Sequence, residues 1–90
     1  MANPIHVRVL TEAGVVLEDE AFSVVAPGEP GYLGILRNHA PLVTTLANGK
    51  LTWRRADGTS RTAVVGPGLL EVFRNRLTLV TDRFSESHVR

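Results

Sequence analysis

Tight-turn signals recur at short intervals in the second half of this 90-residue chain, and they constrain its fold more than any other feature. Asn48-Gly49 and Asp57-Gly58 are strong two-residue hairpin signals, because a type I′ turn needs positive φ at both central positions. Arg74-Asn75 is a weaker signal of the same kind, since asparagine tolerates positive φ. The Gly66-Pro67-Gly68 break separates the last two hairpins. Turns at this spacing, without a helical period between them, predict an all-β fold: an antiparallel β-sandwich or flattened barrel of about ten short strands.

Counting outward from each turn predicts which residues lie opposite one another. Around Asn48-Gly49 the count places Leu46 opposite Leu51, and around Asp57-Gly58 it places Leu51 opposite Val64. These three residues would then share one face across three strands. The same count gives the remaining expected pairs: Thr44 with Trp53, Trp53 with Thr62, Arg54 with Arg61, Val72 with Leu77, and Leu70 with Leu79.

The first half of the chain also has the pattern of strands. Residues 5–9 alternate between apolar and polar side chains, which is typical of a half-buried strand. After a turn at Ala13-Gly14, residues 15–26 form a long second run that contains three adjacent acids, Glu18-Asp19-Glu20. Three neighbouring acids in one strand cannot all face solvent, so we expect a bend or bulge there.

The size and composition of the chain fit one compact domain. Of the 90 residues, 43% are hydrophobic, which suffices for a single core. We assign residues 1–84 to the β-sandwich and the polar residues 85–90 to a flexible C-terminal tail. The sequence contains no cysteine, so no disulfide supports this core.

The net charge and the hydropathy of the chain argue against two classes of partner, nucleic acid and the membrane interior. The formal net charge is +1, a near-balance that argues against a protein built to bind nucleic acid. No apolar run approaches the roughly 18 residues of a membrane-spanning helix, so we expect no direct membrane insertion. Residues 1–10 do not have the pattern of a secretory signal, and the default compartment is therefore the cytoplasm or a membrane surface reached through partners.

No motif in the sequence indicates catalysis or a cofactor. His6, His39 and His88 are far apart and lack the spacing of a metal site. Gly28, Gly31 and Gly34 are better explained as turn glycines than as a phosphate loop, because no Gly-Lys-Ser/Thr occurs. We therefore expect no catalytic residue, cofactor or metal. A small hydrolase built on paired carboxylates stays open as an alternative that no spacing supports.

Arginines close to a tryptophan offer a second alternative, a binding module for nucleic acid or another anionic ligand. An aromatic ring beside arginines can stack on bases. The near-zero net charge favours instead a solvated strand face, and the same arginines could also meet an acidic protein partner. The residues concerned are Trp53, Arg54, Arg55, Arg61, Arg74 and Arg76.

A series of short motifs, in a fixed order, connects the chain to a known family. The motifs are Val24-Val25-Ala26-Pro27-Gly28-Glu29, Gly31-Tyr32-Leu33-Gly34-Ile35-Leu36, His39-Ala40-Pro41-Leu42-Val43, Gly66-Pro67-Gly68-Leu69-Leu70-Glu71-Val72 and Leu77-Thr78-Leu79-Val80-Thr81-Asp82. Each motif is weak by itself, but their order and spacing together are specific. Over residues 4–83 the chain resembles the N-terminal β-sandwich domain of the epsilon subunit of F-type ATP synthases.

The resemblance implies a non-catalytic subunit of the central stalk, or rotor. It would bind the gamma subunit, rest on the polar loops of the membrane c-ring, and help to couple ion translocation to ATP synthesis. It would lie at the cytoplasmic face of the bacterial plasma membrane, or at another coupling membrane. Typical bacterial relatives continue into two inhibitory C-terminal helices, whereas this chain stops at Arg90, so we expect that hairpin to be missing.

By the same resemblance, individual residues receive expected roles. A loop facing the c-ring would comprise Glu29, Pro30, Gly31, Tyr32, Asn38, His39 and Ala40, and the gamma-facing surface would include Val43 and Thr44. Two positions depart from the family pattern. Arg37-Asn38 stands where Pro-Gly is usual, and Tyr32 stands where an acid is frequent. Arginine and tyrosine are both enriched at interface hot spots.

Overall fold

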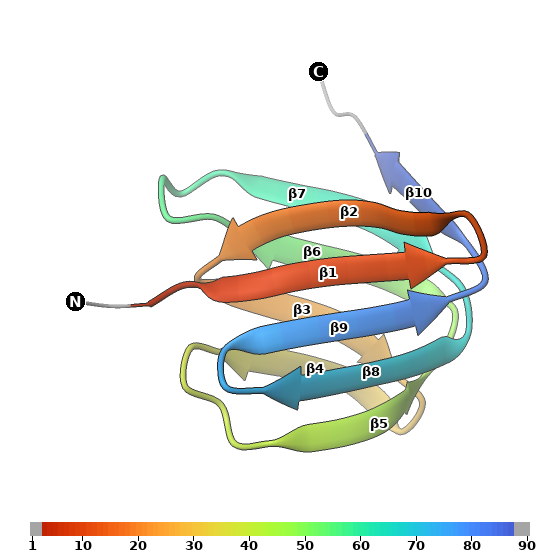
Figure 1. Ribbon diagram of the computed structural model, residues 1–90, viewed down its shortest axis with the longest axis horizontal. Coiled ribbons are helices and arrows are strands. Elements are labelled where there is room, and N and C mark those ends of the chain that lie inside the picture. The colour runs from red at the N-terminus through yellow and green to blue at the C-terminus, as the bar shows by residue number, and fades with distance from the viewer. Residues whose placement is uncertain (1–2, 88–90) are drawn as a thin grey trace.

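The alternation of apolar and polar residues is realised as β-strands along the chain in a computed structural model, which describes residues 3–87 (Figure 1). This part of the chain contains no helix. The ten strands within residues 3–87 are β1 (Ile5–Thr11), β2 (Gly14–Ala21), β3 (Ser23–Gly28), β4 (Gly31–Leu36), β5 (Leu42–Leu46), β6 (Gly49–Arg54), β7 (Ser60–Val65), β8 (Gly68–Phe73), β9 (Arg76–Thr81) and β10 (Phe84–Ser87).

The strands form two layers that close into a flattened barrel, which confirms the predicted fold class. The front layer in Figure 1 has the order β5-β8-β9-β1-β2, and the back layer has the order β10-β7-β6-β3, with β4 paired to β3. The layers join at one corner, where Gly28 of β3 pairs with Leu46 of β5.

Every second side chain of the strands points between the layers and builds one core. Burying a valine, leucine or isoleucine side chain contributes about 1.5–3 kcal/mol, so this set dominates the stability of the domain. The largest fully buried members are Trp53, Ile5, Ile35, Leu51, Leu70, Leu77, Leu79, Val7, Val9, Val24, Val65 and Val72.

The hairpin predicted at Arg74-Asn75 is confirmed. Both residues have positive φ, 50° and 59°, as a type I′ turn requires. The register of β8 against β9 is also as predicted, with Val72 opposite Leu77 and Leu70 opposite Leu79.

The register predicted around Asp57-Gly58 is wrong by one residue. Leu51 lies opposite Ala63 rather than Val64, because only Gly58 has positive φ and the connection is longer than two residues. The N–H of Gly58 donates to the carbonyl of Arg55, and the N–H of Arg55 donates to the carbonyl of Thr59. This is a type I turn followed by a left-handed glycine, the common three-residue hairpin loop. A slip of one residue exchanges the two faces of a strand, so Ala63 and Val65 are buried in place of Val64.

The hairpin predicted at Asn48-Gly49 is also wrong, because β5 and β6 do not pair. The chain passes at this point from the front layer to the back layer, and β5 pairs with β8 and β3 while β6 pairs with β7 and β3. Glycine is needed at position 49 because a side chain would not fit there, and not because the backbone adopts a positive φ. A Cβ atom at this position would lie 2.6 Å from Pro27 Cβ and 2.6 Å from Tyr32 Oη.

Two further expectations for the strands need correction. The pairing is not antiparallel throughout, since β1 and β9 are parallel. The bulge predicted at the three acids lies instead between Val9 and Leu10, where the register against β2 shifts. Glu18-Asp19-Glu20 continue as regular strand because Asp19 turns inward while its two neighbours face outward.

The C-terminal boundary also differs from the assignment of residues 85–90 to a tail. Phe84–Ser87 form β10, which pairs with β7 through four residue pairs from Phe84–Val65 to Ser87–Thr62. Residues 88–90, the remainder of the expected tail, lie outside the described part of the chain.

Candidate interaction surfaces

Asp19 lies at the centre of a charged cluster that bridges the two layers. Its carboxylate accepts hydrogen bonds from Trp53 Nε1 at 2.8 Å and from Arg61 Nη1 at 2.9 Å. Arg55 Nε lies 3.5 Å away. Arg61 in turn holds Glu86 of β10 in a bidentate pair at 2.5 and 2.7 Å. The cluster therefore ties β2 to β6, β7 and β10 along the side of the barrel where, within residues 3–87, no strand pairing joins the layers.

The electrostatics of this cluster favour its charged form. Burial by itself raises the pKa of Asp19, but the hydrogen bonds from Trp53 and the backbone of Glu20, with the charges of Arg55 and Arg61, outweigh it. The pKa of Asp19 therefore lies below its ordinary value. Hydrogen bonding to Glu86 raises the pKa of Arg61 above its already high value.

This arrangement weakens the nucleic-acid alternative. Trp53 is 0% exposed and belongs to the core, so its ring cannot stack on bases. Arg55 and Arg61 are neutralised by Asp19 and Glu86. The inward position of Asp19 was not predicted from the sequence. Strand parity could have indicated it, because Leu17, Asp19 and Ala21 share one face and the first and last of these are apolar.

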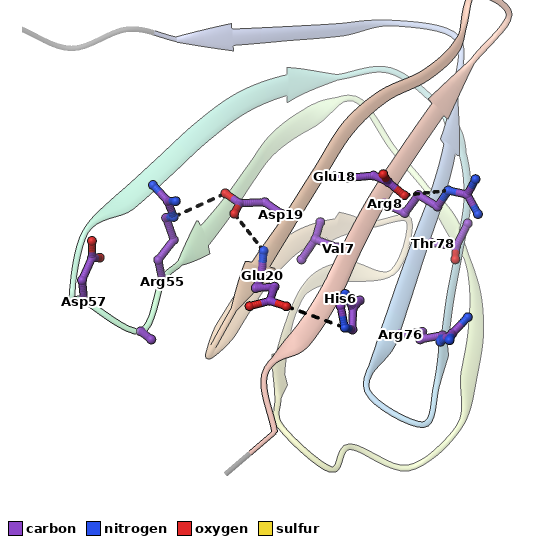
Figure 2. Close-up of a pocket in the computed structure, with 11 residues that line it drawn as sticks. His6, Val7, Arg8, Glu18, Asp19, Glu20, Arg55, Asp57, Arg76 and Thr78 are labelled. Carbon is purple, nitrogen blue, oxygen red and sulfur yellow. Dashed lines mark hydrogen bonds and ion pairs between the residues drawn. The ribbon is translucent and has the colours of Figure 1, made fainter. Parts of the chain in front are cut away.

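A groove of about 810 Å³ lies on the outer face of β1, β2 and β9, beside the loop between β6 and β7 (Figure 2). In Figure 2, Asp19, Glu18 and Glu20 each lie beside a basic partner. Glu18 lies 3.4 Å from Arg8, and Glu20 lies 3.8 Å from His6. Since the pKa of Asp19 is lowered rather than raised, this carboxylate is not suited to act as a general acid at neutral pH. The paired-carboxylate hydrolase therefore gains no support.

The outer face of the front layer is apolar at one end and charged at the other. Strand register aligns three rows of outward side chains across this face. The first row is Thr45, Leu69, Val80, Leu10 and Val15; the second is Val43, Glu71, Thr78, Arg8 and Glu18; the third is Phe73, Arg76, His6 and Glu20. Leu69, Val80 and Val43 are each at least half exposed, so this face carries an apolar patch of the kind that marks interfaces.

The seven residues expected to face the c-ring fall into two groups at opposite ends of β4. Glu29-Pro30-Gly31-Tyr32 surround the turn between β3 and β4, whereas Asn38-His39-Ala40 belong to the loop between β4 and β5 (Figure 1). A six-residue strand spans about 17–20 Å, so the structure does not bring the groups together into one loop.

Each group is held by specific contacts. In the first, Tyr32 Oη accepts a hydrogen bond from the N–H of Lys50 at 3.0 Å, and the side chain of Glu29 accepts one from Thr45 Oγ1 at 2.7 Å. In the second, the Asn38 N–H donates to Asn75 Oδ1 at 2.6 Å, and Asn75 Nδ2 donates back to Asn38 Oδ1 at 3.1 Å. His39 Nδ1 lies 2.7 Å from the carbonyl oxygen of Ala40. The first turn is therefore fixed to β5 and β6, and the second to the turn between β8 and β9.

The two residues expected to face gamma lie on opposite sides of β5. Val43 points outward and is 68% exposed, in the second row of the front face. Thr44 is partly buried and lies opposite the core residue Leu70.

The described part of the chain offers no helix that could cross a bilayer. Residues 3–87 also hold no group of three or more histidine, cysteine, aspartate or glutamate side chains placed to bind a metal ion.

Sequence comparison connects this domain with a family. Residues 4–87 match the family model described as ATP synthase, Delta/Epsilon chain, beta-sandwich domain. The ATP synthase epsilon chain of Moorella thermoacetica is 39% identical over 83 residues, which cover 92% of this chain and 62% of that one. The epsilon chain of Polaromonas naphthalenivorans is 41% identical over 80 residues, or 89% of this chain and 58% of that one. The chain thus spans about three fifths of the length of these curated relatives.

Two solved structures share the fold. A chain of the Euglena gracilis mitochondrial ATP synthase, determined as the OSCP/F1/c-ring assembly, superposes with a TM-score of 0.87 at 18% identity. The match covers 96% of this chain and 55% of that chain. A chain of the Tetrahymena thermophila mitochondrial ATP synthase central stalk and c-ring superposes with a TM-score of 0.72 at 17% identity, over 89% of this chain and 64% of that chain. At these identities the likeness concerns the fold alone.

Proposed function

Because the chain belongs to the ATP synthase delta/epsilon chain family, through its β-sandwich domain, we propose that it is a non-catalytic subunit of the central stalk of an F-type ATP synthase. In this role it links the gamma subunit to the polar loops of the membrane c-ring. It thereby helps to couple ion translocation to ATP synthesis, as a peripheral part of the complex at the cytoplasmic face of the bacterial plasma membrane or at another coupling membrane.

The observation that carries this proposal is the family match, which runs without interruption from the first strand to the last, over residues 4–87. The two structures of the same fold come from assemblies that include the c-ring, and one of them is an assembly of the central stalk with the c-ring. The fold suits a mechanical role. A close-packed β-sandwich is poorly compressible and transmits strain between the surfaces that grip its neighbours.

For the c-ring we propose a contact along the length of β4. The groups Glu29-Pro30-Gly31-Tyr32 and Asn38-His39-Ala40 lie at opposite ends of this strand, so a single partner surface reaches both only if β4 lies along it. β4 pairs with β3 alone among the strands of residues 3–87, which leaves its other edge open to such a partner.

For gamma we propose a contact with the outer face of the front layer. Val43 is the most exposed of its large apolar residues, and Leu69 and Val80 lie in the neighbouring row. Thr44, which points to the inner side of β5, would support the position of Val43 rather than touch gamma itself.

The test is calorimetric titration of the purified chain with its gamma subunit. We expect a one-to-one complex with a Kd of about 1 μM or tighter, a binding free energy of about −8 kcal/mol. Val43→Asp should weaken this binding about tenfold or more, because it places a charge in an apolar contact. Val25→Asp is the matched control, since Val25 is also exposed but lies on the back layer opposite Thr52.

The two parts of the proposal fail separately. If the unmodified chain does not bind gamma, the stalk assignment is contradicted. If Val43→Asp binds as tightly as the unmodified chain, the stalk assignment stands and the proposed gamma-facing surface is wrong.

A further inference from the structure

Arg37 follows directly after β4, and its charge has no partner within residues 3–87. Its guanidinium lies over the ring of Phe22, 4.0 Å from the ring centroid. The Nη1 atom is buried and has no hydrogen-bond acceptor in the described part of the chain. A buried donor without an acceptor is costly, and a charged one more so. The free chain therefore keeps a partly desolvated cation in a fixed position.

The strands bring a second cation and an exposed leucine to the same end of the back layer. Ser23 of β3 lies opposite Leu36 of β4 on one side and opposite Arg54 of β6 on the other. The N–H of Phe22 donates to the carbonyl of Arg54 at 2.7 Å, which fixes the aromatic residue beside that strand. Leu36 is 65% exposed. Phe22, Leu36, Arg37 and Arg54 form what we call the Arg37 patch.

Among the described residues, the arginines of this patch lack the carboxylate partners that several other arginines of the domain have. Arg8, Arg55 and Arg61 each have a carboxylate within 4.0 Å. Within residues 3–87, neither Arg37 nor Arg54 forms such an ion pair. The outward strand positions around the patch carry no acid either, whereas the front layer presents Glu18, Glu20 and Glu71. The patch therefore has an uncompensated positive charge around an apolar centre.

We propose that the Arg37 patch is a docking site for an acidic segment of a partner protein. A carboxylate of the segment pairs with the guanidinium of Arg37, and an apolar side chain packs on Leu36 and Phe22. Arginine, an aromatic ring and a leucine at one place have the chemistry of an interface anchor, and a charge-assisted pair suits a planar guanidinium.

Two features favour a carboxylate here. Because the ring of Phe22 already removes water from one face of the guanidinium, less hydration remains to be lost on binding. The attraction is also stronger near the apolar ring than in bulk water. Two cations beside a leucine fit a short acidic and apolar peptide better than a polyanion, which would require a longer basic surface.

The proposed gamma contact lies on the front layer and leaves the patch free, whereas Leu36 and Arg37 adjoin the proposed c-ring contact along β4. The inference concerns the free chain and is tested without either stalk partner, so its outcome is independent of the stalk assignment.

The experiment follows the Arg37 patch by nuclear magnetic resonance. The ¹⁵N-labelled chain is titrated with a short capped peptide of alternating glutamate and leucine, and in parallel with the same peptide carrying glutamine in place of glutamate. Backbone amides and arginine Nε–H signals are recorded. We expect saturable shifts centred on Leu36, Arg37 and Arg54, and affinity about tenfold lower for the glutamine peptide, equivalent to about 1.4 kcal/mol.

Variants distinguish a specific ion pair between Arg37 and the peptide from a general electrostatic attraction between the chain and the peptide. Arg37→Gln should lower the affinity for the glutamate peptide about tenfold. Arg37→Lys keeps the charge but loses the planar guanidinium, so its affinity should lie between those of the unmodified chain and Arg37→Gln. Arg74→Gln is the matched control, because Arg74 also stacks on an aromatic ring, that of Phe73 at 5.3 Å, but on a different hairpin. It should bind the peptide as the unmodified chain does. A thermal unfolding curve for each variant shows that the comparison is made on folded protein.

Three results would overturn the proposal. The first is the absence of saturable shifts at the patch with the glutamate peptide. The second is equal affinity for the glutamate and glutamine peptides, or for the unmodified chain and Arg37→Gln. The third is equal or tighter binding of oligothymidylate or of phosphatidylglycerol vesicles at the same signals, which would assign the patch to polyanions or membrane surfaces instead of an acidic protein segment.

Discussion

Replacing Asp19 by asparagine should destabilise the domain by about 2 kcal/mol, although the two side chains have nearly the same size. The carboxylate is only 11% exposed and accepts hydrogen bonds from Trp53 Nε1 at 2.8 Å and Arg61 Nη1 at 2.9 Å. A hydrogen bond to a charged group contributes about 1.5–3 kcal/mol, against about 0.5–1.5 kcal/mol for a neutral pair. Weakening two such bonds by about 1 kcal/mol each gives the expected loss. The ion pair with Arg55 adds little, because the Arg55 side chain is exposed to solvent.

The assay is urea unfolding followed by the fluorescence of Trp53, the single tryptophan of the chain. For a domain of this size the loss corresponds to a fall in Tm of about 8–16 °C. Glu18→Gln is the matched control on the same strand. Its ion pair with Arg8, at 3.4 Å, is exposed on both sides, so its loss should cost less than about 0.5 kcal/mol.

The effect of Asp19→Asn should also depend on pH in a definite direction. The pKa of Asp19 is lower in the folded chain than in the unfolded chain, where it is about 3.9. Its charge therefore stabilises the fold fully above the unfolded value, and this contribution is lost as the pH falls through the folded pKa. The difference between the unmodified chain and Asp19→Asn should be constant near pH 7 and shrink in acid. Equal stabilities for Asp19→Asn and Glu18→Gln at pH 7 would refute the role assigned to the cluster.

Two further changes test the packing of the turns. Gly68→Ala should destabilise strongly, by about 3 kcal/mol or more, because the added Cβ would overlap the backbone carbonyl of Val80, which cannot move aside as a side chain would; urea unfolding measures this, and a loss below about 1 kcal/mol would contradict the crowding. Asn75→Ala should cost about 1–2 kcal/mol, since it removes both hydrogen bonds to Asn38 and replaces asparagine by a residue that tolerates the positive φ of 59° less well; a Tm equal to that of the unmodified chain would show that the amide pair does not hold the loop.

The turns show how far the sequence could predict this fold. Arg74-Asn75 was the weakest of the three signals and gave the correct register, whereas Asn48-Gly49 and Asp57-Gly58 did not. Dipeptide preference describes the local φ of a turn but not which strands it joins. At Gly49 the decisive factor is the close approach of Pro27 and Tyr32, residues distant in sequence, and local preference carries no information about it.

The candidate surfaces were less predictable than the strands. The family resemblance predicted that seven residues form one loop that faces the c-ring. In the structure these residues lie at the two ends of β4, because residues 31–36 form a continuous strand. Three adjacent acids suggested a distortion, yet Asp19 stays in the regular strand because Trp53, Arg55 and Arg61 compensate its charge. Such compensation depends on tertiary contacts between residues more than thirty positions apart, which a single sequence does not reveal.

The parallel pairing of β1 with β9 has a consequence for how the domain folds. These strands lie side by side within the front layer, yet His6 pairs with Arg76, seventy positions later. The hairpin of β1 with β2 and that of β8 with β9 each form from nearby residues, but the layer is joined only when the two halves meet. Such distant contacts make folding slow, in the range of milliseconds to seconds. Until these contacts form, the hairpin of β1 and β2 has an unpaired edge that can associate with another chain. In a newly made chain, this edge of β1 stays exposed until β9 has been synthesised and pairs with it.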